Sequence, residues 1–400
     1  MAVQQSVDLA QETAPSQRSV DAPSAVVAAA YLIALNQLVA NIQPLLLGAL
    51  ATDYGLSDRQ LGHVSAFYVG AVTLCTLSAP LWIRRINWRL ATLVSVAGCV
   101  AAFAWGATLN GVGMFLLLFA ILGFAKGFFG APAFASLGDG SNPDRGYGLS
   151  TVLQSLIAAG AAAPVASYII PTYGVRGLFI SLALVYATGI VAARWMPVGA
   201  RSPRAASLSP AEPGEALLSW AAIPPLVAGF AVALFAGGIL AFWYFVERIG
   251  VARGVPAQTI GLTISLAAFA SILTSAINTW LGGRVPSLAF VAAGTALLLA
   301  SYAVLLVPGD LAFVACNLLF ALGWGFAQPA YWTIVRRVDH TGRLFVAAPA
   351  ASGAAGVAIG IFAGPVIESG GYSGLIGLSS ALIAAAILCI VGVLRFAAAR

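Results

Sequence analysis

The 400-residue chain is 60% hydrophobic and only 8% charged, and its mean hydropathy is +0.96. Soluble domains carry about 25% charged residues, so this composition excludes a soluble domain and indicates a polytopic membrane protein. The basic residues behind the net charge of +6 stand at the ends of apolar runs and form no single stripe, so we expect no nucleic-acid partner.

Residues 1–24 are polar and lack the apolar core of a signal peptide, which predicts a disordered tail. Apolar runs of about 20 residues, enough to cross a bilayer, then recur along the chain. They predict an all-α membrane protein with twelve transmembrane helices, near 26–50, 62–83, 90–109, 112–136, 148–169, 175–195, 219–246, 258–279, 286–307, 311–334, 345–367 and 373–396. The turn signal Asn110-Gly111 separates the third of these from the fourth.

The polar segment 197–217 divides the predicted helices into two six-helix halves, 25–196 and 218–400, and is interpreted as a linker. If the N-terminus is cytoplasmic, fourteen arginines fall on its side of the membrane and four on the other. The positive-inside rule therefore places both termini and the linker in the cytoplasm. Abundant Ala and Gly, with many Arg and a single Lys, are typical of a GC-rich bacterium, which predicts the inner membrane.

The two halves share short sequences at an offset near 200 residues, which indicates a duplicated unit. The segment from Gly127 to Ala133 is similar to that from Gly325 to Ala330. Ala163-Pro164-Val165 is likewise repeated as Gly364-Pro365-Val366, and Gly177-Leu178 as Gly374-Leu375.

With this organisation the chain resembles the major facilitator superfamily over essentially all of residues 25–397. The basic loop Ala79–Arg89 stands where that family has a Gly-x-x-x-Asp-Arg-x-Gly-Arg-Arg motif, but it keeps only the basic character. Gly123–Gly127 matches the glycine part of a fourth-helix motif, and Ala159–Pro164 is a reduced form of the fifth-helix antiporter motif. The resemblance implies a secondary transporter with two pseudo-symmetric halves and a fourth helix that lines a central cavity.

Ionisable groups in a membrane span are costly and are functional candidates by default. Lys126, the only lysine, lies about ten residues from the cytoplasmic end of its span, beyond comfortable snorkelling reach. The resemblance places it where it meets an anionic group of a substrate. The alternative is a structural lysine that binds backbone carbonyls.

Amides in the first span are a second set of candidates, because their donors need partners in lipid. The set is Asn36, Gln37, Asn41 and Gln43. A substrate-facing surface and interhelical bonding remain equally open. The tenth span carries Asn317, Trp324, Gln328 and Tyr331 within about 60° on a helix. Such a stripe suits a flat organic ligand, although ordinary packing with interfacial aromatics is the alternative.

The seventh span ends in Trp243, Tyr244 and Glu247, of which the first two are candidates for substrate binding. Glu247 is a candidate for proton coupling, although it stands beside Arg248 and an interfacial position explains it equally. Gly356, Gly360 and Gly364 form a small-residue ridge that permits close helix packing.

Charges at the cytoplasmic ends of the helices are candidates for an inner gate, although topology anchoring alone would explain the arginines. They are Arg84, Arg85, Asp139 and Arg145 in the first half and Arg284, Asp339 and Arg343 in the second. No Ser-His-Asp set, metal-ligand cluster or Walker motif occurs, so we predict neither an enzyme nor a cofactor.

These observations predict a monomeric secondary transporter of a small organic solute, moved by alternating access with or without a co-transported proton. Lys126 favours a carboxylate as the substrate, and an aromatic carboxylate is one candidate. An exporter of apolar amphiphiles is the second hypothesis, and a membrane receptor that transports nothing is the third.

Overall fold

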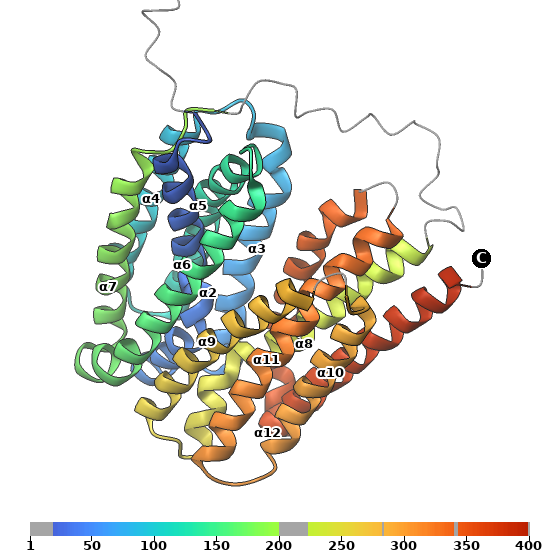
Figure 1. Ribbon diagram of the computed structural model, residues 1–400. Helices are drawn as coiled ribbons and strands as arrows, with labels where there is room; N and C mark the ends of the chain where they lie inside the picture. The colour runs from blue at the N-terminus through green and yellow to red at the C-terminus, as the bar shows by residue number, and fades with distance from the viewer. Residues whose placement is uncertain (1–18, 200–222, 282–283, 340–342, 399–400) are drawn as a thin grey trace, which may run out of the picture.

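A computed structural model describes residues 19–199, 223–281, 284–339 and 343–398, and all regular structure in these ranges is helical (Figure 1). Most of the predicted tail and linker lies outside the described residues. The N-terminal half contains α2 (Pro23–Tyr54), α3 (Asp58–Trp82), α4 (Trp88–Gly106), α5 (Val112–Gly138), α6 (Pro143–Pro164), the π-helical turn η1 (Val165–Ile169) and α7 (Ile170–Ala193). The C-terminal half contains α8 (Ile223–Ala252), α9 (Ala257–Leu281), α10 (Ser287–Val304), α11 (Asp310–Val338) and α12 (Arg343–Ala398).

Ten helical stretches of the described chain are long and apolar enough to cross a membrane. Two of them, Arg145–Ala193 and Pro349–Phe396, are 49 and 48 residues long. At 1.5 Å per residue each would extend roughly 70 Å, more than twice the ~30 Å hydrocarbon layer. Each is interrupted by one non-helical residue, Gly174 or Gly371. The predicted count of twelve crossings therefore rests on counting each interrupted stretch twice.

Glycine is required at these two interruptions, because φ is +62° at Gly174 and +63° at Gly371. In the first half the helix that follows is capped from α2: Asp53 Oδ2 accepts a hydrogen bond from the backbone N–H of Val175 at 2.6 Å. A carboxylate at a helix N-terminus satisfies a free N–H and complements the helix dipole. This contact fixes the turn between the two helical segments.

The backbone repeats itself at an offset of about 200 residues. Six glycines in the described chain have positive φ, and they form three pairs in corresponding places of the two halves. The pairs are Gly55 with Gly254, Gly111 with Gly309, and Gly174 with Gly371. The internal duplication predicted from sequence is therefore present in the turns as well as in the order of the helices.

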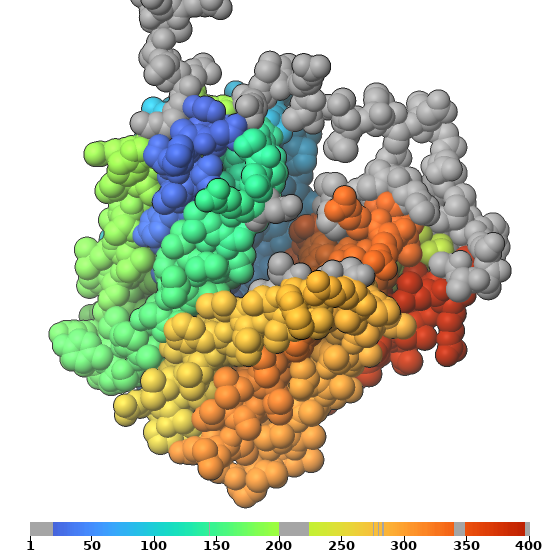
Figure 2. Space-filling view, in the orientation of Figure 1, coloured from blue at the N-terminus to red at the C-terminus, as the bar shows by residue number. Residues whose placement is uncertain are grey.

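The two halves meet through the pairs α3–α12, α6–α9 and α2–α8. Figure 2 shows α9, in yellow, lying across the lower part of α6, in green. The closest approach is between α3 and α12, where a Cβ on Gly360 would lie 2.6 Å from the carbonyl oxygen of Gly62. The same face of α12 also brings Gly356 against Val69 and Gly364 against the backbone of Arg59. The predicted glycine ridge is confirmed as a close-packing surface between the halves.

Replacing Gly360 with valine should separate α3 from α12, since the new side chain would overlap the backbone at Gly62. We expect a longer distance between spin labels at Arg176 and Ser369, two exposed positions in opposite halves at the end away from the linker. Double electron–electron resonance measures this distance.

The matched control is Gly377→Val in the same helix, since a Cβ at Gly377 has no neighbour within 4 Å. It should leave the distance unchanged. An unaltered distance in Gly360→Val would contradict a role for the glycine contact in closing this end.

Candidate functional site

Lys126 lies in α5 and is only 7% exposed. Its ammonium stands 5.2 Å from the centroid of the Tyr68 ring on α3, a cation–π contact. Cys99 of α4 is the nearest ionisable neighbour that interacts with it electrostatically. Within the described chain the ammonium has no ion pair and no hydrogen bond. A buried cation without a counter-charge is costly, so this group is suited to receiving an anion.

Two of the first-span amides bind neighbouring helices of their own half. Asn36 Nδ2 donates to the backbone carbonyl of Lys126 at 2.8 Å, and Gln43 Nε2 donates to Ser65 Oγ at 3.0 Å. Both side chains are buried. These contacts are the interhelical bonding that was one of the two interpretations of this set. Asn41 differs, because its Nδ2 is buried with no hydrogen-bond partner in the described chain.

Trp243 joins the two halves near the middle of the membrane span. Its indole N–H donates to the carbonyl of Ala40 on α2 at 3.0 Å. This carbonyl lacks its helical partner because Pro44, four residues on, has no N–H. In α11, Pro329 likewise frees the carbonyl of Gly325. There the donor comes from the same half, since Asn278 Nδ2 binds that oxygen at 2.7 Å.

Tyr244, next to Trp243, is 1% exposed, and its hydroxyl has no hydrogen-bond partner among the described residues. A Cβ on Gly356 would lie 3.1 Å from this hydroxyl oxygen and 3.1 Å from Val69 Cγ1. The hydroxyl of a C-terminal-half residue therefore lies beside α3 of the N-terminal half. Tyr244 is consequently part of the contact between the halves.

Glu247 of α8 extends across the contact between the halves, and its carboxyl group lies against Gly48 of α2. A Cβ at Gly48 would overlap its carboxyl group, so only glycine leaves room for it there. Glu247 Oε2 is buried and has no hydrogen-bond partner in the described chain. Its charged neighbours are Arg248 and Asp58, which lie 3.5 Å apart. The carboxyl group thus packs between α8 and α2.

The four candidate residues of the tenth span lie in different environments. Asn317 and Tyr331 are each 1% exposed, whereas Trp324 and Gln328 are half-buried. Tyr331 stacks on Phe235 with ring centroids 4.5 Å apart. Packing thus accounts for the two buried members, and the half-buried pair remains available to a ligand.

Charged side chains join the halves at the end away from the linker. Arg59 on α3 forms a two-point ion pair with Glu368 on α12. Asp58 lies 3.5 Å from Arg248 and accepts a hydrogen bond from the Tyr372 hydroxyl at 3.1 Å. Sequence reasoning missed this cluster, because Arg59 was counted only as a residue of the outer side. The adjacent opposite charges of Asp58 and Arg59 at a helix start were the signal available.

At the linker end, the predicted inner latch of the first half lies within that half. Arg84 donates to both carboxylate oxygens of Asp139, at 2.5 and 3.0 Å. The hydrogen bond and the charge of Asp139 raise the pKa of Arg84. Because Arg84 follows α3 and Asp139 ends α5, the pair ties two helices of one half and does not bridge the halves in this conformation. Arg85 and Arg145 are exposed.

The corresponding charges of the second half are Arg284, Asp339 and Arg343. Arg284 donates to the carbonyl of Trp280 at 3.1 Å and stacks over the ring of the same residue. Asp339 is buried. The side chain of Arg343 lies outside the described residues.

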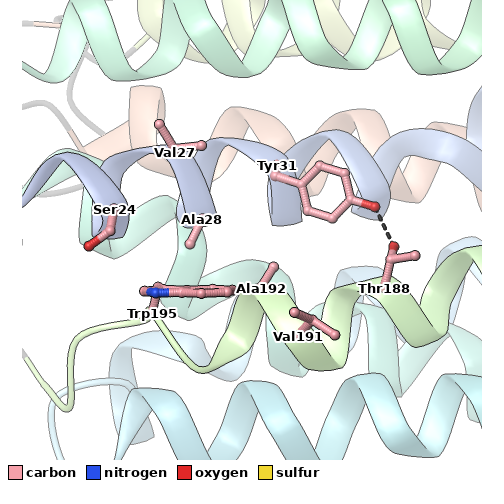
Figure 3. A pocket seen from close by; sticks show the side chains of 8 residues that line it. All are labelled: Ser24, Val27, Ala28, Tyr31, Thr188, Val191, Ala192 and Trp195. Carbon is pink, nitrogen blue, oxygen red and sulfur yellow. Dashed lines mark hydrogen bonds between the residues drawn. The ribbon is translucent and has the colours of Figure 1, made fainter.

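A groove of about 560 Å³ lies between α2 and α7 (Figure 3). Apolar side chains dominate its lining, with Trp195 at one end. The hydrogen bond between Tyr31 and Thr188 is at the other end. Because both helices belong to the N-terminal half, this groove does not lie between the halves.

Comparison with known proteins agrees with this architecture. The profile of the Major Facilitator Superfamily matches residues 29–348. The chain belongs to the major facilitator superfamily. It is therefore a multi-pass membrane protein of a transporter family, as the sequence predicted.

Two solved structures share the superfamily fold with this chain. The nucleoside transporter NupG matches with a TM-score of 0.68 and 12% identity, covering 92% of this chain and 98% of its own. A point mutant of NupG matches with a TM-score of 0.70 and 10% identity, covering 92% and 99%. At these identities the likeness concerns the fold alone. No curated protein matches the sequence.

The contribution of the hydrogen bond between Trp243 and Ala40 to stability can be measured by substitution. Trp243→Phe should lower the free energy of unfolding by about 1 kcal/mol, because it leaves a buried carbonyl unpaired. In a Pro44→Ala background the same substitution should cost much less, since residue 44 then supplies the helical N–H. Reversible unfolding of the four proteins in detergent measures this interaction energy.

Trp195→Phe is the control, because Trp195 is 40% exposed and lies away from Ala40. It should behave alike in both backgrounds. Equal costs of Trp243→Phe with and without Pro44 would show that the indole N–H does not serve the freed carbonyl.

Proposed function

We propose that this chain carries a small organic anion, most simply a carboxylate, across the membrane by alternating access, with Lys126 as the charge that binds it. The observation that carries the proposal is the buried ammonium of Lys126, which has no counter-charge in the described chain. An arriving carboxylate would supply that charge in a site of low dielectric, where ion pairs are strong.

The contacts between the halves support alternating access as the mechanism. The ion pairs of Arg59 and Asp58 hold the halves together at the end away from the linker. The hydrogen bond from Trp243 to Ala40 lies nearer the middle. If the linker is cytoplasmic, as the arginine distribution predicts, this conformation is closed toward the outside. Transport then requires these contacts to break while the halves rock about the site.

Export of apolar or amphiphilic compounds is the second candidate function. The apolar groove between α2 and α7 favours it. Such a transporter would tolerate the loss of Lys126, which separates it from the first candidate. For either function we place the protein as a monomer in a bacterial inner membrane, with both termini in the cytoplasm.

Glu247 is the proposed coupling residue. Its carboxyl group is buried against Gly48 with Oε2 unpaired, and the neighbouring Arg248 lies 3.5 Å from Asp58. Burial without a hydrogen-bond partner favours the neutral form of a carboxyl group. We therefore infer that Glu247 holds a proton while the end away from the linker is closed and loses it when water enters.

Lys126→Ala and Lys126→Gln should abolish binding of carboxylates while the protein still folds. Removing one partner of a buried ion pair costs about 3–5 kcal/mol, which corresponds to at least a hundredfold loss of affinity at ~1.4 kcal/mol per decade. Lys126→Arg should retain part of the affinity because the charge survives. Isothermal titration of the purified proteins with a panel of organic acids and their amides measures the effect.

Arg176→Gln is the matched control, since it removes a positive charge from an exposed position. It should leave affinity unchanged. If Lys126→Ala bound every acid as tightly as the parent, Lys126 would be structural and the exporter hypothesis would take precedence.

Glu247→Gln should make transport insensitive to an imposed pH gradient, because glutamine cannot release a proton. Uptake into proteoliposomes, with the internal and external pH set independently, measures this response. Asp310→Asn serves as control, because this carboxylate at the start of α11 is exposed. A full response to the gradient in Glu247→Gln would remove Glu247 from the coupling mechanism.

A further inference from the structure

Two tyrosine hydroxyls between the halves are buried without any hydrogen bond. Tyr68 on α3 is 3% exposed and Tyr244 on α8 is 1% exposed. Neither hydroxyl has a partner among the described residues. Buried tyrosine hydroxyls normally find one, because an unmade hydrogen bond leaves the cost of desolvation uncompensated. Two such groups in one region therefore point to a ligand or an ordered water.

Tyr68 contacts Lys126, and Tyr244 is in turn a neighbour of Tyr68. The ammonium of Lys126 stands 5.2 Å from the centroid of the Tyr68 ring. The phenol of Tyr68 in turn interacts electrostatically with that of Tyr244. Gly356 packs closely beside the Tyr244 hydroxyl and beside Val69, the residue that follows Tyr68 in α3. The three side chains thus follow one another from α5 through α3 to α8, across the boundary between the halves.

The three groups share one chemistry, since each donates a hydrogen bond. A carboxylate only accepts, and its two oxygens offer about four acceptor sites. One ammonium leaves most of those sites free, and two phenol hydroxyls are suited to filling them. Hydrogen bonds to a charged acceptor are also roughly twice as strong as bonds between neutral groups.

We propose that Tyr68 and Tyr244 determine the specificity of the Lys126 site, each donating its hydroxyl to the carboxylate that the ammonium attracts. This inference rests on the proposed function and adds two residues to it, one from each half. A carboxylate held in this way would touch both halves at once. Each of the three side chains is at most 7% exposed, so the anion enters only when the halves move apart.

The sequence provides a direct probe, because Lys126 is the only lysine in the chain. Protein labelled with carbon-13 at lysine Cε gives a single lysine side-chain signal by NMR. Benzoate is the probe ligand, acetate is the smallest carboxylate for comparison, and benzamide is the neutral analogue of benzoate. The signal is followed in the parent, Tyr68→Phe and Tyr244→Phe.

In the parent, benzoate should shift the signal saturably and benzamide should not. Each phenylalanine variant should bind benzoate roughly tenfold more weakly, the effect of one charge-assisted hydrogen bond. The ring remains, so the ligand-free signal and the thermal midpoint should stay near those of the parent. Tyr168→Phe is the matched control, since this tyrosine is 59% exposed on η1, and it should bind like the parent.

The outcomes separate this inference from the proposed function. Benzoate affinity that is unchanged in both phenylalanine variants, with a signal that still responds, overturns the role of the tyrosines and leaves the Lys126 site standing. A parent signal that responds to neither benzoate nor acetate overturns both, and the hydroxyls then bind water alone. An equal loss of benzoate and benzamide binding would indicate a structural role and also overturns the inference.

Discussion

The contact between the two halves depends on backbone approach at Gly62 and Gly360. Because neither residue has a side chain, α3 and α12 come closer than any other residue would allow. The neighbouring contacts between α3 and α12 follow from that approach. It brings Arg59 within reach of Glu368, and it places Val69 against Gly356, beside the Tyr244 hydroxyl. Bulk at this contact would disturb the charged cluster and the buried tyrosines together.

Much of the fold was predictable because a bilayer imposes simple constraints on a sequence. Length and apolar content define a crossing, so the runs were found, and the turn expected at Asn110-Gly111 is where α5 begins. The helical link through η1 was not predictable. Its π-helical turn depends on how α6 packs against α9, where Ser265 Oγ accepts a hydrogen bond from the Ala163 N–H. Hydropathy contains no information on such a contact.

The candidate site was predictable only where a residue is unusual in its own surroundings. Lys126 stands out because charge in an apolar span is costly. Tyr68 does not, since a tyrosine in a membrane helix is ordinary until its neighbours are known. Its unpaired hydroxyl results from helices distant in sequence. The same limit applies to Arg84: the sequence supplied its charge and that of Asp139, but not the fact that their ion pair lies within one half.

The two halves repeat the same backbone conformation, but they carry different polar side chains. This difference determines which half can hold a functional group. Asp53 caps a helix in the first half, whereas the second half has Ala252 at the corresponding place, two residues before Gly254. The ammonium of α5 likewise has no counterpart in α11, where the matching position of the repeat is Trp324. A symmetric scaffold can rock, but the ammonium that would attract an anion belongs to the first half alone. The second half can then sense the anion only through residues that cross the boundary, and Tyr244 is placed to do so.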